Sequence, residues 1–182
     1  VGNDADLGGL GEAVYGAGRG KRIVAYLTVG TGVGGARIVD RRIDANAFGF
    51  EPGHQILDLS SASAEGIRCS CGEKAAAHLE ALVSGSAVRR RYGAEKVSDL
   101  PQDVKDEIVR VLAAGVYNCI VMWSPDIVVL GGGIIESGAL SLEGIRRQAM
   151  RYVTMFNSFP PVVKGALGEK AVLYGALSLL CR

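Results

Sequence analysis

Two cysteines separated by one residue, Cys69 and Cys71, mark the segment with the clearest capacity for chemistry. They lie between Glu51-Pro-Gly-His54 and His78-Leu-Glu80, so residues 51–80 contain thiols, imidazoles and carboxylates. Thiolates and imidazoles are the ligands that tetrahedral Zn²⁺ prefers, and carboxylates can accept hydrogen bonds from the hydroxyl groups of a polyol. The segment therefore predicts a zinc site beside a site for a polar small molecule.

The four cysteines do not indicate a disulfide framework. Cys119 and Cys181 lie in apolar runs, where a thiol usually acts as a small buried hydrophobe. Cysteines separated by one residue rarely close a relaxed disulfide on each other, whereas one turn of backbone can direct both sulfurs at a metal. The sequence also contains no pattern typical of a signal peptide or a membrane span. We expect a cytoplasmic protein.

The composition indicates a globular chain. With 182 residues, 48% of them hydrophobic, and a net charge of +1, it can bury a substantial core as one domain or as one lobe of a larger protein. The balanced charge gives no electrostatic footprint for nucleic acid or for a membrane surface. The 26 glycines cluster between apolar segments, as at 30–35 and 131–133, which is typical of turns. The chain begins without Met, and we expect a fragment.

Apolar periodicity predicts alternating strands and helices. Segments 22–29 and 34–40 are expected to form a hairpin across Gly30-Thr-Gly-Val33, and 126–130 is expected to be a buried strand that ends in three glycines. Helices are expected over residues 4–16, 77–91, 103–122, 138–152 and 169–180. This order of elements predicts an α/β fold.

Several motifs occur in a specific order along the chain. They are Asn3-Asp-Ala-Asp6, Thr28 to Gly35, Glu51-Pro-Gly-His54, Cys69-Ser-Cys-Gly72 followed by Leu79-Glu80, Leu130-Gly-Gly-Gly133 and Gly175-Ala-Leu177. One of these alone would be a weak signal, but the ordered set resembles the ROK family of repressors, unassigned reading frames and sugar kinases, here of the glucokinase or fructokinase type.

The resemblance implies an α/β fold of the actin-like ATPase class, which is ribonuclease H-like and of the hexokinase type. Residues 1–182 would form a single domain, the larger C-terminal lobe, with residues 51–80 as a zinc-binding and sugar-binding loop within it. In that family another phosphate-binding hairpin and the N-terminal lobe lie upstream. We expect these 182 residues by themselves to be poorly active.

The resemblance also implies ATP-dependent transfer of a phosphoryl group to a sugar hydroxyl. This reaction needs a carboxylate to receive the hydroxyl proton, a backbone cradle for phosphate, and Mg²⁺ with the ATP. Asp4 resembles the family's catalytic base, and Asn3 resembles its neighbour that binds the sugar. The alternative is that Asp4 only caps the first helix.

Two glycine-rich turns resemble the family's ATP-binding loops. The first contains Gly30, Thr31 and Gly32, and the second contains Gly131, Gly132 and Gly133. Glycine lets backbone N–H groups approach a phosphate closely, and a following helix N-terminus favours an anion. The alternative for each is an ordinary tight turn.

Glu51, His54 and Glu80 resemble the family's remaining hexose ligands, although a charged residue beside Gly and Pro is more commonly part of an exposed loop. The resemblance further implies a structural zinc. Its ligands would be His54, Cys69, Cys71 and His78, with no position left open for water. The family pattern has a third cysteine where this chain places His78. The alternative is that the third ligand and the metal have been lost, and that His78 is a surface residue.

Three functions remain open from the sequence. The first is an ATP-dependent hexose kinase, with a hexose and ATP as partners and a homodimer or homotetramer as the assembly. The second is a sugar-responsive transcriptional regulator whose DNA-binding segment lies elsewhere. From this part of the chain we expect no contact with nucleic acid or with a membrane. The third is a zinc-stabilised interaction module. Retention of Asp4 together with the turn at 30–35 favours the kinase.

Overall fold

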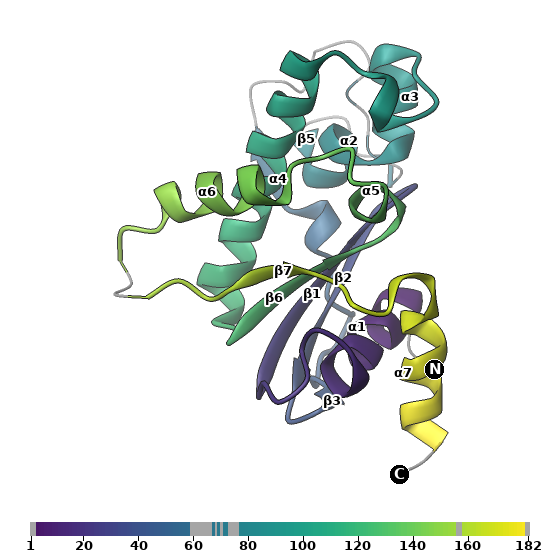
Figure 1. Cartoon of the computed structure of the whole chain (residues 1–182), viewed down its shortest axis with the longest axis vertical. Helices are drawn as coiled ribbons and strands as arrows, with labels where there is room; N and C mark the ends of the chain where they lie inside the picture. Colours follow the sequence, from purple (N-terminus) through teal and green to yellow (C-terminus); the bar gives the residue numbers. More distant parts are fainter. Residues whose placement is uncertain are drawn as a thin grey trace.

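The computed structural model describes residues 3–58, 67, 69, 71–72, 77–155 and 158–180. Within these residues, a five-stranded sheet has the strand order β3-β2-β1-β6-β7 (Figure 1). The strands are β1 (Ile23–Val29), β2 (Val33–Val39), β3 (Arg42–Ile43), β6 (Ile127–Gly131) and β7 (Val162–Lys164). β1 is antiparallel to β2 and parallel to β6, which is itself parallel to β7. A smaller sheet pairs β4 (Ile56–Asp58) with β5 (Ala77–His78).

Helices cover both faces of the large sheet (Figure 1). On one face lie α1 (Asp4–Tyr15) and α7 (Ala171–Leu180), and on the other lie α4 (Gln102–Trp123) and α6 (Leu142–Tyr152). Successive side chains of β1 alternate between these faces, as a strand requires. Val24 and Tyr26 pack with the cluster on the α1 side, whereas Ala25, Leu27 and Val29 pack with the cluster on the α4 side. The predicted α/β architecture is confirmed.

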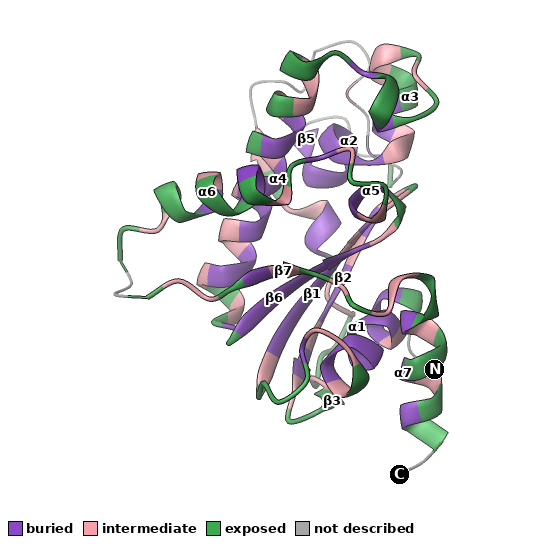
Figure 2. Ribbon diagram, viewed as in Figure 1, coloured by how far each residue is buried: buried purple, intermediate pink, exposed green. Residues whose placement is uncertain are grey.

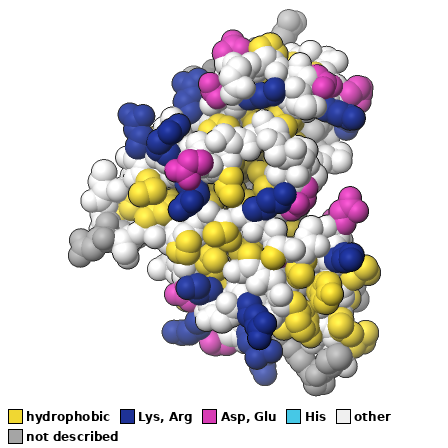
Figure 3. Space-filling view, viewed as in Figure 1, with side chains coloured by type: hydrophobic (Ala, Val, Ile, Leu, Met, Phe, Trp, Pro, Cys, Tyr) yellow, Lys and Arg dark blue, Asp and Glu magenta, His cyan; other side chains and the backbone are white. Residues whose placement is uncertain are grey.

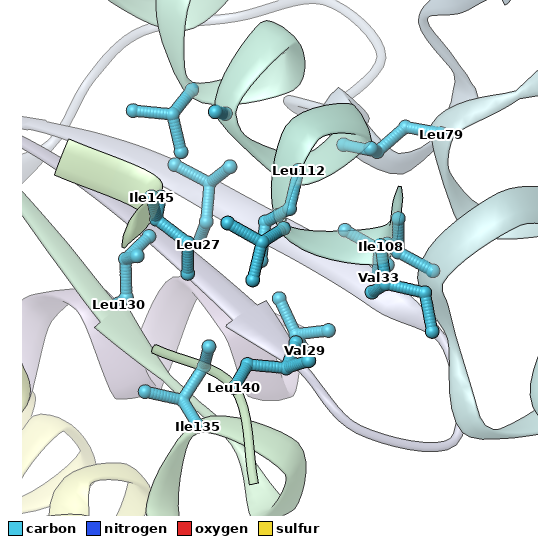
Figure 4. Close-up of a cluster of buried hydrophobic side chains, with 14 of the residues drawn as sticks. Leu27, Val29, Val33, Leu79, Ile108, Leu112, Leu130, Ile135, Leu140 and Ile145 are labelled. Carbon is cyan, nitrogen blue, oxygen red and sulfur yellow. The ribbon is translucent and has the colours of Figure 1, made fainter. Parts of the chain in front are cut away.

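The cluster on the α4 side is the larger of the two apolar cores. In Figure 4, Leu27 of β1, Leu130 of β6, Leu112 of α4 and Ile145 of α6 lie close together, and each is fully buried. The strands are buried along their centres, and β6 is buried at every residue (Figure 2). Because β6 has neighbours on both edges and both faces, its apolar run could be recognised from the sequence as a central strand.

The helix expected over residues 77–91 is wrong as a continuous element. Residues 77–78 form β5, and two short helices follow, α2 (Leu79–Val83) and α3 (Gly85–Tyr92). Ser84 separates them because its backbone is extended, and its hydroxyl accepts a hydrogen bond of 3.1 Å from the N–H of Ala87. A serine that caps one helix cannot also continue the helix before it, since its backbone is non-helical.

Three further differences concern element ends and short elements. Helix α6 begins at Leu142, not at 138, because Ser141 caps it and Gly138 has a positive φ of 70°. Strand β7 was not expected. The structure also contains α5 (Gly133–Glu136) and the 3₁₀ turns η1 (Pro52–His54), η3 (Val97–Asp99) and η4 (Gly168–Lys170).

Cys119 is buried in α4, as its apolar surroundings predict. Burial raises the pKa of its thiol to about 12, so it is neutral near pH 7. Cys181 lies outside the described residues. Among the helices in the part of the chain that the structure describes, none combines the length and apolar character needed to cross a bilayer.

Candidate active site

The turn between β1 and β2 lies beside the turn that follows β6. Thr28 of β1 pairs with Gly131 of the parallel strand β6, so the two strands end side by side at their carboxyl ends. A Cβ atom placed on Gly30 would lie 3.9 Å from the backbone N of Gly133. The crevice outside the carboxyl ends of parallel strands is where open α/β sheets place their ligands.

A pocket of about 420 Å³ opens at the carboxyl ends of β1 and β6. Gly30, Thr31 and Gly133 line it, so three of the six residues predicted to bind ATP meet around one cavity. Its remaining wall comes from α3, α5 and residues 95–98, and includes apolar Val88, Val97 and Ile134. Its charged residues are Arg89, Glu95 and Lys96, and Arg89 pairs with Glu95 at 3.5 Å. The volume lies in the range of small-molecule pockets, and the lining offers apolar surface for a flat ring, with a net positive charge of one.

A larger hollow of about 650 Å³ lies at the amino ends of β1 and β6. Its lining residues include Lys21, Asp126 and Phe159. None of the residues predicted to bind a ligand lines it. The smaller pocket is therefore the stronger candidate.

The other three predicted glycines lie outside the pocket lining and have steric roles. A Cβ atom on Gly32 would come within 2.6 Å of the Glu80 carboxylate, and one on Gly131 within 2.6 Å of the Tyr26 hydroxyl. Gly132 has a φ of 89°, and its Cβ would meet the backbone of β1 at 2.6 Å. Sequence reasoning missed Tyr26, whose pKa is raised chiefly by burial.

The start of α3 supports the first glycine turn. The N–H of Gly85 donates to the carbonyl of Gly30 at 2.8 Å, and the N–H of Ser86 donates to the carbonyl of Thr31 at 3.1 Å. The first N–H groups of a helix have no partner inside it, so the turn satisfies donors that α3 would otherwise leave open. The sequence Ser84-Gly-Ser86 is a helix-start signal that could have pointed to this role.

Asn3, not Asp4, caps α1. The Asn3 side-chain oxygen accepts from the N–H of Asp6 at 2.7 Å, and the Asp6 carboxylate accepts from the N–H of Asn3 at 3.4 Å, which is a capping box. Asp4 is exposed at the first helical position, and its carboxylate accepts from the N–H of Ala5 at 3.0 Å. The alternative that Asp4 is the helix cap is therefore wrong.

The start of β2 has a different neighbour on each face. A Cβ atom on Gly34 would lie 3.1 Å from that of Ala5 in α1, and one on Gly35 would lie 2.5 Å from the ring of Pro52 in η1. Strand β3 pairs with Ile38 and Val39 of β2. Among the described residues, no strand pairs with the outer edge of β2 at Gly34 and Gly35.

The predicted base and three predicted sugar ligands are chain neighbours of these two contacts. Asn3 and Asp4 immediately precede Ala5 on one face, and Glu51 and His54 bracket the Pro52 contact on the other. Asn3, Asp4 and Glu51 are exposed, and His54 is half-buried. The backbone segments that carry these polar residues therefore contact β2 on both of its faces.

The predicted metal ligands converge. One ligand atom from each of His54, Cys69, Cys71 and His78 lies within 4.8 Å of all the others. The Cys69 sulfur is 3.3 Å from His54 Nδ1, and the Cys71 sulfur is 3.5 Å from His78 Nδ1. With the bond lengths of tetrahedral zinc, neighbouring ligand atoms would lie ~3.3–3.8 Å apart. The donor set therefore fits a Zn²⁺ ion, and the two sulfur–nitrogen distances lie within this range.

His78 is buried, so the alternative that it is a surface residue is wrong. It lies at the end of β5, where it pairs with Ile56 of β4, and its ring meets that of His54 edge to face at 5.4 Å. Burial raises the pKa of the Cys69 thiol, and a cation bound by the sulfur would act in the opposite direction.

Glu80 lies between the metal cluster and the glycine turn. Its Oε2 accepts a hydrogen bond of 2.9 Å from the N–H of Val33, and its Oε1 lies 3.7 Å from the Cys69 sulfur. The residue is 8% exposed. The predicted sugar ligand therefore faces the protein interior and contacts the backbone of the turn.

Gln55 holds η1 against α4, a role that no sequence pattern indicated. Its Nε2 donates to the carbonyl of Pro52 at 2.8 Å, and its Oε1 accepts from Asn118 of α4 at 2.8 Å. Because Gln55 follows His54 directly, these bonds set the position of the His54 segment.

The chain is similar to both kinases and repressors. It is 30% identical to a glucokinase of Thermotoga maritima over 98% of this chain and 64% of that protein, and 26% identical to a xylose repressor of Bacillus spizizenii over 98% of this chain and 49% of that protein. The chain therefore spans about two thirds of the glucokinase and about half of the repressor.

Solved structures show the same fold. A ROK hexokinase from Thermus thermophilus superposes with a TM-score of 0.83 at 28% identity, over 97% of this chain and 63% of that one. A ROK family glucokinase from Streptomyces griseus, solved in complex with glucose and AMPPNP, superposes with a TM-score of 0.78 at 26% identity, over 98% of this chain and 67% of that one.

These likenesses confirm the predicted actin-like, hexokinase-type α/β fold. The model of one family, described as the ROK family, matches residues 1–182. Since that match spans the whole sequence, the chain belongs to the ROK family.

Proposed function

We propose that the protein is an ATP-dependent sugar kinase that transfers the γ-phosphoryl group to a hydroxyl of a hexose in the cytoplasm. The observation that carries this proposal is the position of the 30–32 turn. One side of the turn lines the 420 Å³ pocket with Gly133, and its other end leads into β2, which Ala5 and Pro52, the chain neighbours of Asp4 and Glu51, contact from opposite faces. A nucleotide in the pocket and a sugar at the edge would meet at the turn.

Each group then has a role that its surroundings support. Asp4 is exposed and is not the helix cap, so its carboxylate can receive the proton of the attacking hydroxyl. The backbone of Gly30 and Thr31 binds phosphate oxygens, and Gly133 borders the remainder of the nucleotide. Mg²⁺ bound with ATP supplies positive charge for the phosphates.

Sugar binding requires several polar partners, because each buried hydroxyl without a partner costs roughly 1–3 kcal/mol. Asn3, Glu51 and His54 supply donors and acceptors from the two faces of β2. The amide oxygen of Asn3 is occupied by the cap, so its Nδ2 group is the donor available to a sugar. We assign Glu80 to the same site through its contact with the turn.

We further propose that His54, Cys69, Cys71 and His78 hold a structural Zn²⁺. Four protein ligands leave no open position, so the ion would hold chain segments together and would not activate water. A homodimer or homotetramer remains our proposal for the assembly.

The test is turnover of hexoses by the full-length protein in a coupled assay, with Asp4→Asn compared against Asp103→Asn. Both aspartates are exposed and lie in the first turn of a helix, so the pair controls for effects on the helix dipole. We expect Asp4→Asn to lower kcat by ~10²–10⁴-fold, which is typical for loss of a general base, and Asp103→Asn to leave it within about twofold. Equal activity of the two variants would refute the assignment of Asp4.

A sugar-responsive regulator is the second candidate, and the similarity to xylose repressors supports it. A regulator would bind sugar without consuming ATP. If the full-length protein bound a hexose, hydrolysed no ATP with it, and bound the sugar equally well as Asp4→Asn, the regulator would replace the kinase.

A further inference from the structure

His54 and His78 belong to the Cys/His cluster, and the two segments that carry them also contact the start of β2. The first is η1, which ends at His54. A Cβ atom on Gly53 would lie 2.0 Å from the carbonyl oxygen of Val33, so the backbone of η1 packs directly on this peptide group. The ring of Pro52 packs against Gly35. Any side chain at Gly53 would displace η1 from β2.

The second segment runs from His78 into α2 and α3, and it contacts the same turn. The Glu80 carboxylate accepts the N–H of Val33 at 2.9 Å. The N–H groups of Gly85 and Ser86 donate to the carbonyls of Gly30 and Thr31. Val33 is therefore held at its carbonyl by one histidine-bearing segment and at its N–H by the other.

Besides the cluster, backbone pairing joins the two segments, and both also pack on α4, the first through Gln55 and the second through Leu79. The N–H of Leu79 donates to the carbonyl of Gln55 at 3.0 Å, and Ile56 pairs with His78 in the short β4–β5 sheet, whose register is irregular. Such a small sheet is marginal without further support. A metal bound by His54 and His78, with the two cysteines, would fix the distance between the segments directly.

We propose that metal at the Cys/His cluster sets the conformation of the turn at residues 30–33, so that metal occupancy raises affinity for the ligand of the adjoining pocket, with Glu80 as the positioning residue that transmits the effect. The identity of that ligand as a nucleoside triphosphate rests on the proposed function. The coupling of the cluster to the turn rests on the contacts of the two segments with residues 30–35, whatever the ligand is.

The coupling predicts a local change in hydrogen exchange. In the full-length protein, we expect removal of zinc by a chelator to speed exchange of the Val33, Gly85 and Ser86 amides by at least ~10-fold, because their acceptors move with the two segments. The amide of Val129 in the central strand β6 serves as the internal reference and should not change. Unchanged exchange at Val33, or equal acceleration at Val129, would overturn the proposal.

The second measurement is binding of Mg²⁺·AMPPNP by calorimetry, with and without zinc. We expect zinc to tighten binding by ~5- to 150-fold, the usual range for coupled sites, and linkage requires AMPPNP to tighten zinc binding by the same factor. Equal AMPPNP affinity in the two states would refute the coupling. Absence of AMPPNP binding in both states would refute the proposed function and would leave the exchange result to decide the coupling.

Variants of Glu80 test its positioning role. Glu80→Ala removes the acceptor for the Val33 N–H, so the zinc-dependent factor in AMPPNP affinity should fall to about one while the zinc content is kept. Glu80→Gln retains a carbonyl oxygen at the same place and should restore the factor. If Glu80→Ala kept the full coupling factor, or if Glu80→Gln behaved as Glu80→Ala does, Glu80 would not be the link.

Discussion

His78 is one of the four side chains proposed to bind zinc. The resemblance to the ROK pattern places it where a cysteine is expected, and its ring nitrogen lies 3.5 Å from the Cys71 sulfur. Two thiolates and two neutral imidazoles balance the double charge of Zn²⁺, whereas three thiolates leave a net negative charge. Because His78 and Cys69 are buried, a neutral complex carries a smaller desolvation penalty. The substitution is thus compatible with retention of the metal.

The prediction at this scale concerns zinc content. His78→Ala removes one of four ligands, so we expect the zinc measured by mass spectrometry to fall from about one ion per chain to well below half. Cys119→Ser is the matched control, because this buried cysteine lies in α4 outside the cluster, and its zinc content should not change. Unchanged stoichiometry in His78→Ala would remove His78 from the ligand set.

At the scale of elements, the contact between α1 and α7 determines where the helix carrying Asp4 lies. The two helices approach so closely that a Cβ atom on Gly175 would lie 1.8 Å from the carbonyl oxygen of Leu7, and one on Gly11 would lie 2.1 Å from that of Ala171. Glycine at both positions lets the backbones touch. The Gly175-Ala-Leu177 motif therefore has a packing role.

The other side of α7 is apolar and exposed. Figure 3 shows hydrophobic side chains gathered at the lower right, over α7. Its exposed large residues are Leu173, Tyr174, Leu177, Leu179 and Leu180. On its buried side, α7 contacts α1 through these glycines, and the ring of Tyr174 also meets that of Tyr15 in α1 at 5.5 Å.

Gly175→Ala should therefore destabilise the protein. The added methyl group must push two helix backbones apart, and we expect a loss of ~1–3 kcal/mol in the free energy of unfolding, measured by urea titration. Gly144→Ala in α6 is the control, because its Cβ would meet only side-chain atoms, at 3.2 Å, and it should change stability by less than about 1 kcal/mol. Equal stability of the two variants would contradict the close contact.

At the scale of the whole molecule, the pocket exists because distant parts of the chain meet at one edge of the sheet. Gly30, Val97 and Gly133 come from three separate regions of the sequence. The neighbouring glycines Gly132 and Gly133 differ here, since a Cβ atom on Gly132 would strike β1, whereas one on Gly133 would meet no atom within 4 Å. Only the assembled structure distinguishes them.

Gly133→Leu should fill the pocket without disturbing the fold. We expect its free energy of unfolding to stay within about 1 kcal/mol of the wild type, because the new side chain enters open space, while AMPPNP affinity falls by at least ~10-fold. Hexose affinity is the internal control and should persist, since the edge of β2 lies outside the pocket. By contrast, Gly132→Ala should lose ~1–3 kcal/mol of stability. Unchanged nucleotide affinity in Gly133→Leu would refute the pocket assignment.

Much of the architecture and of the candidate site could be predicted from local patterns. The apolar run before Gly131 predicted β6, and the glycines between two apolar segments predicted the β1–β2 hairpin, because both signals act over a few residues. The types and order of the cysteines and histidines likewise predicted that His54, Cys69, Cys71 and His78 lie together. The break at Ser84 was missed because the apolar periodicity continued across a residue whose cap geometry ends it.

The sequence by itself determined which groups are available: the donor set of the cluster, the alternation of strands and helices, and the motifs of the family. The cap of α1 is also a local matter, since Asn3 and Asp6 are only three residues apart. Only the tertiary structure decided that His78 is buried and that Glu80 turns toward the N–H of Val33. These outcomes depend on contacts between residues far apart in the chain, and the direction of a side chain there follows from packing and hydrogen-bond partners, not from its neighbours in sequence.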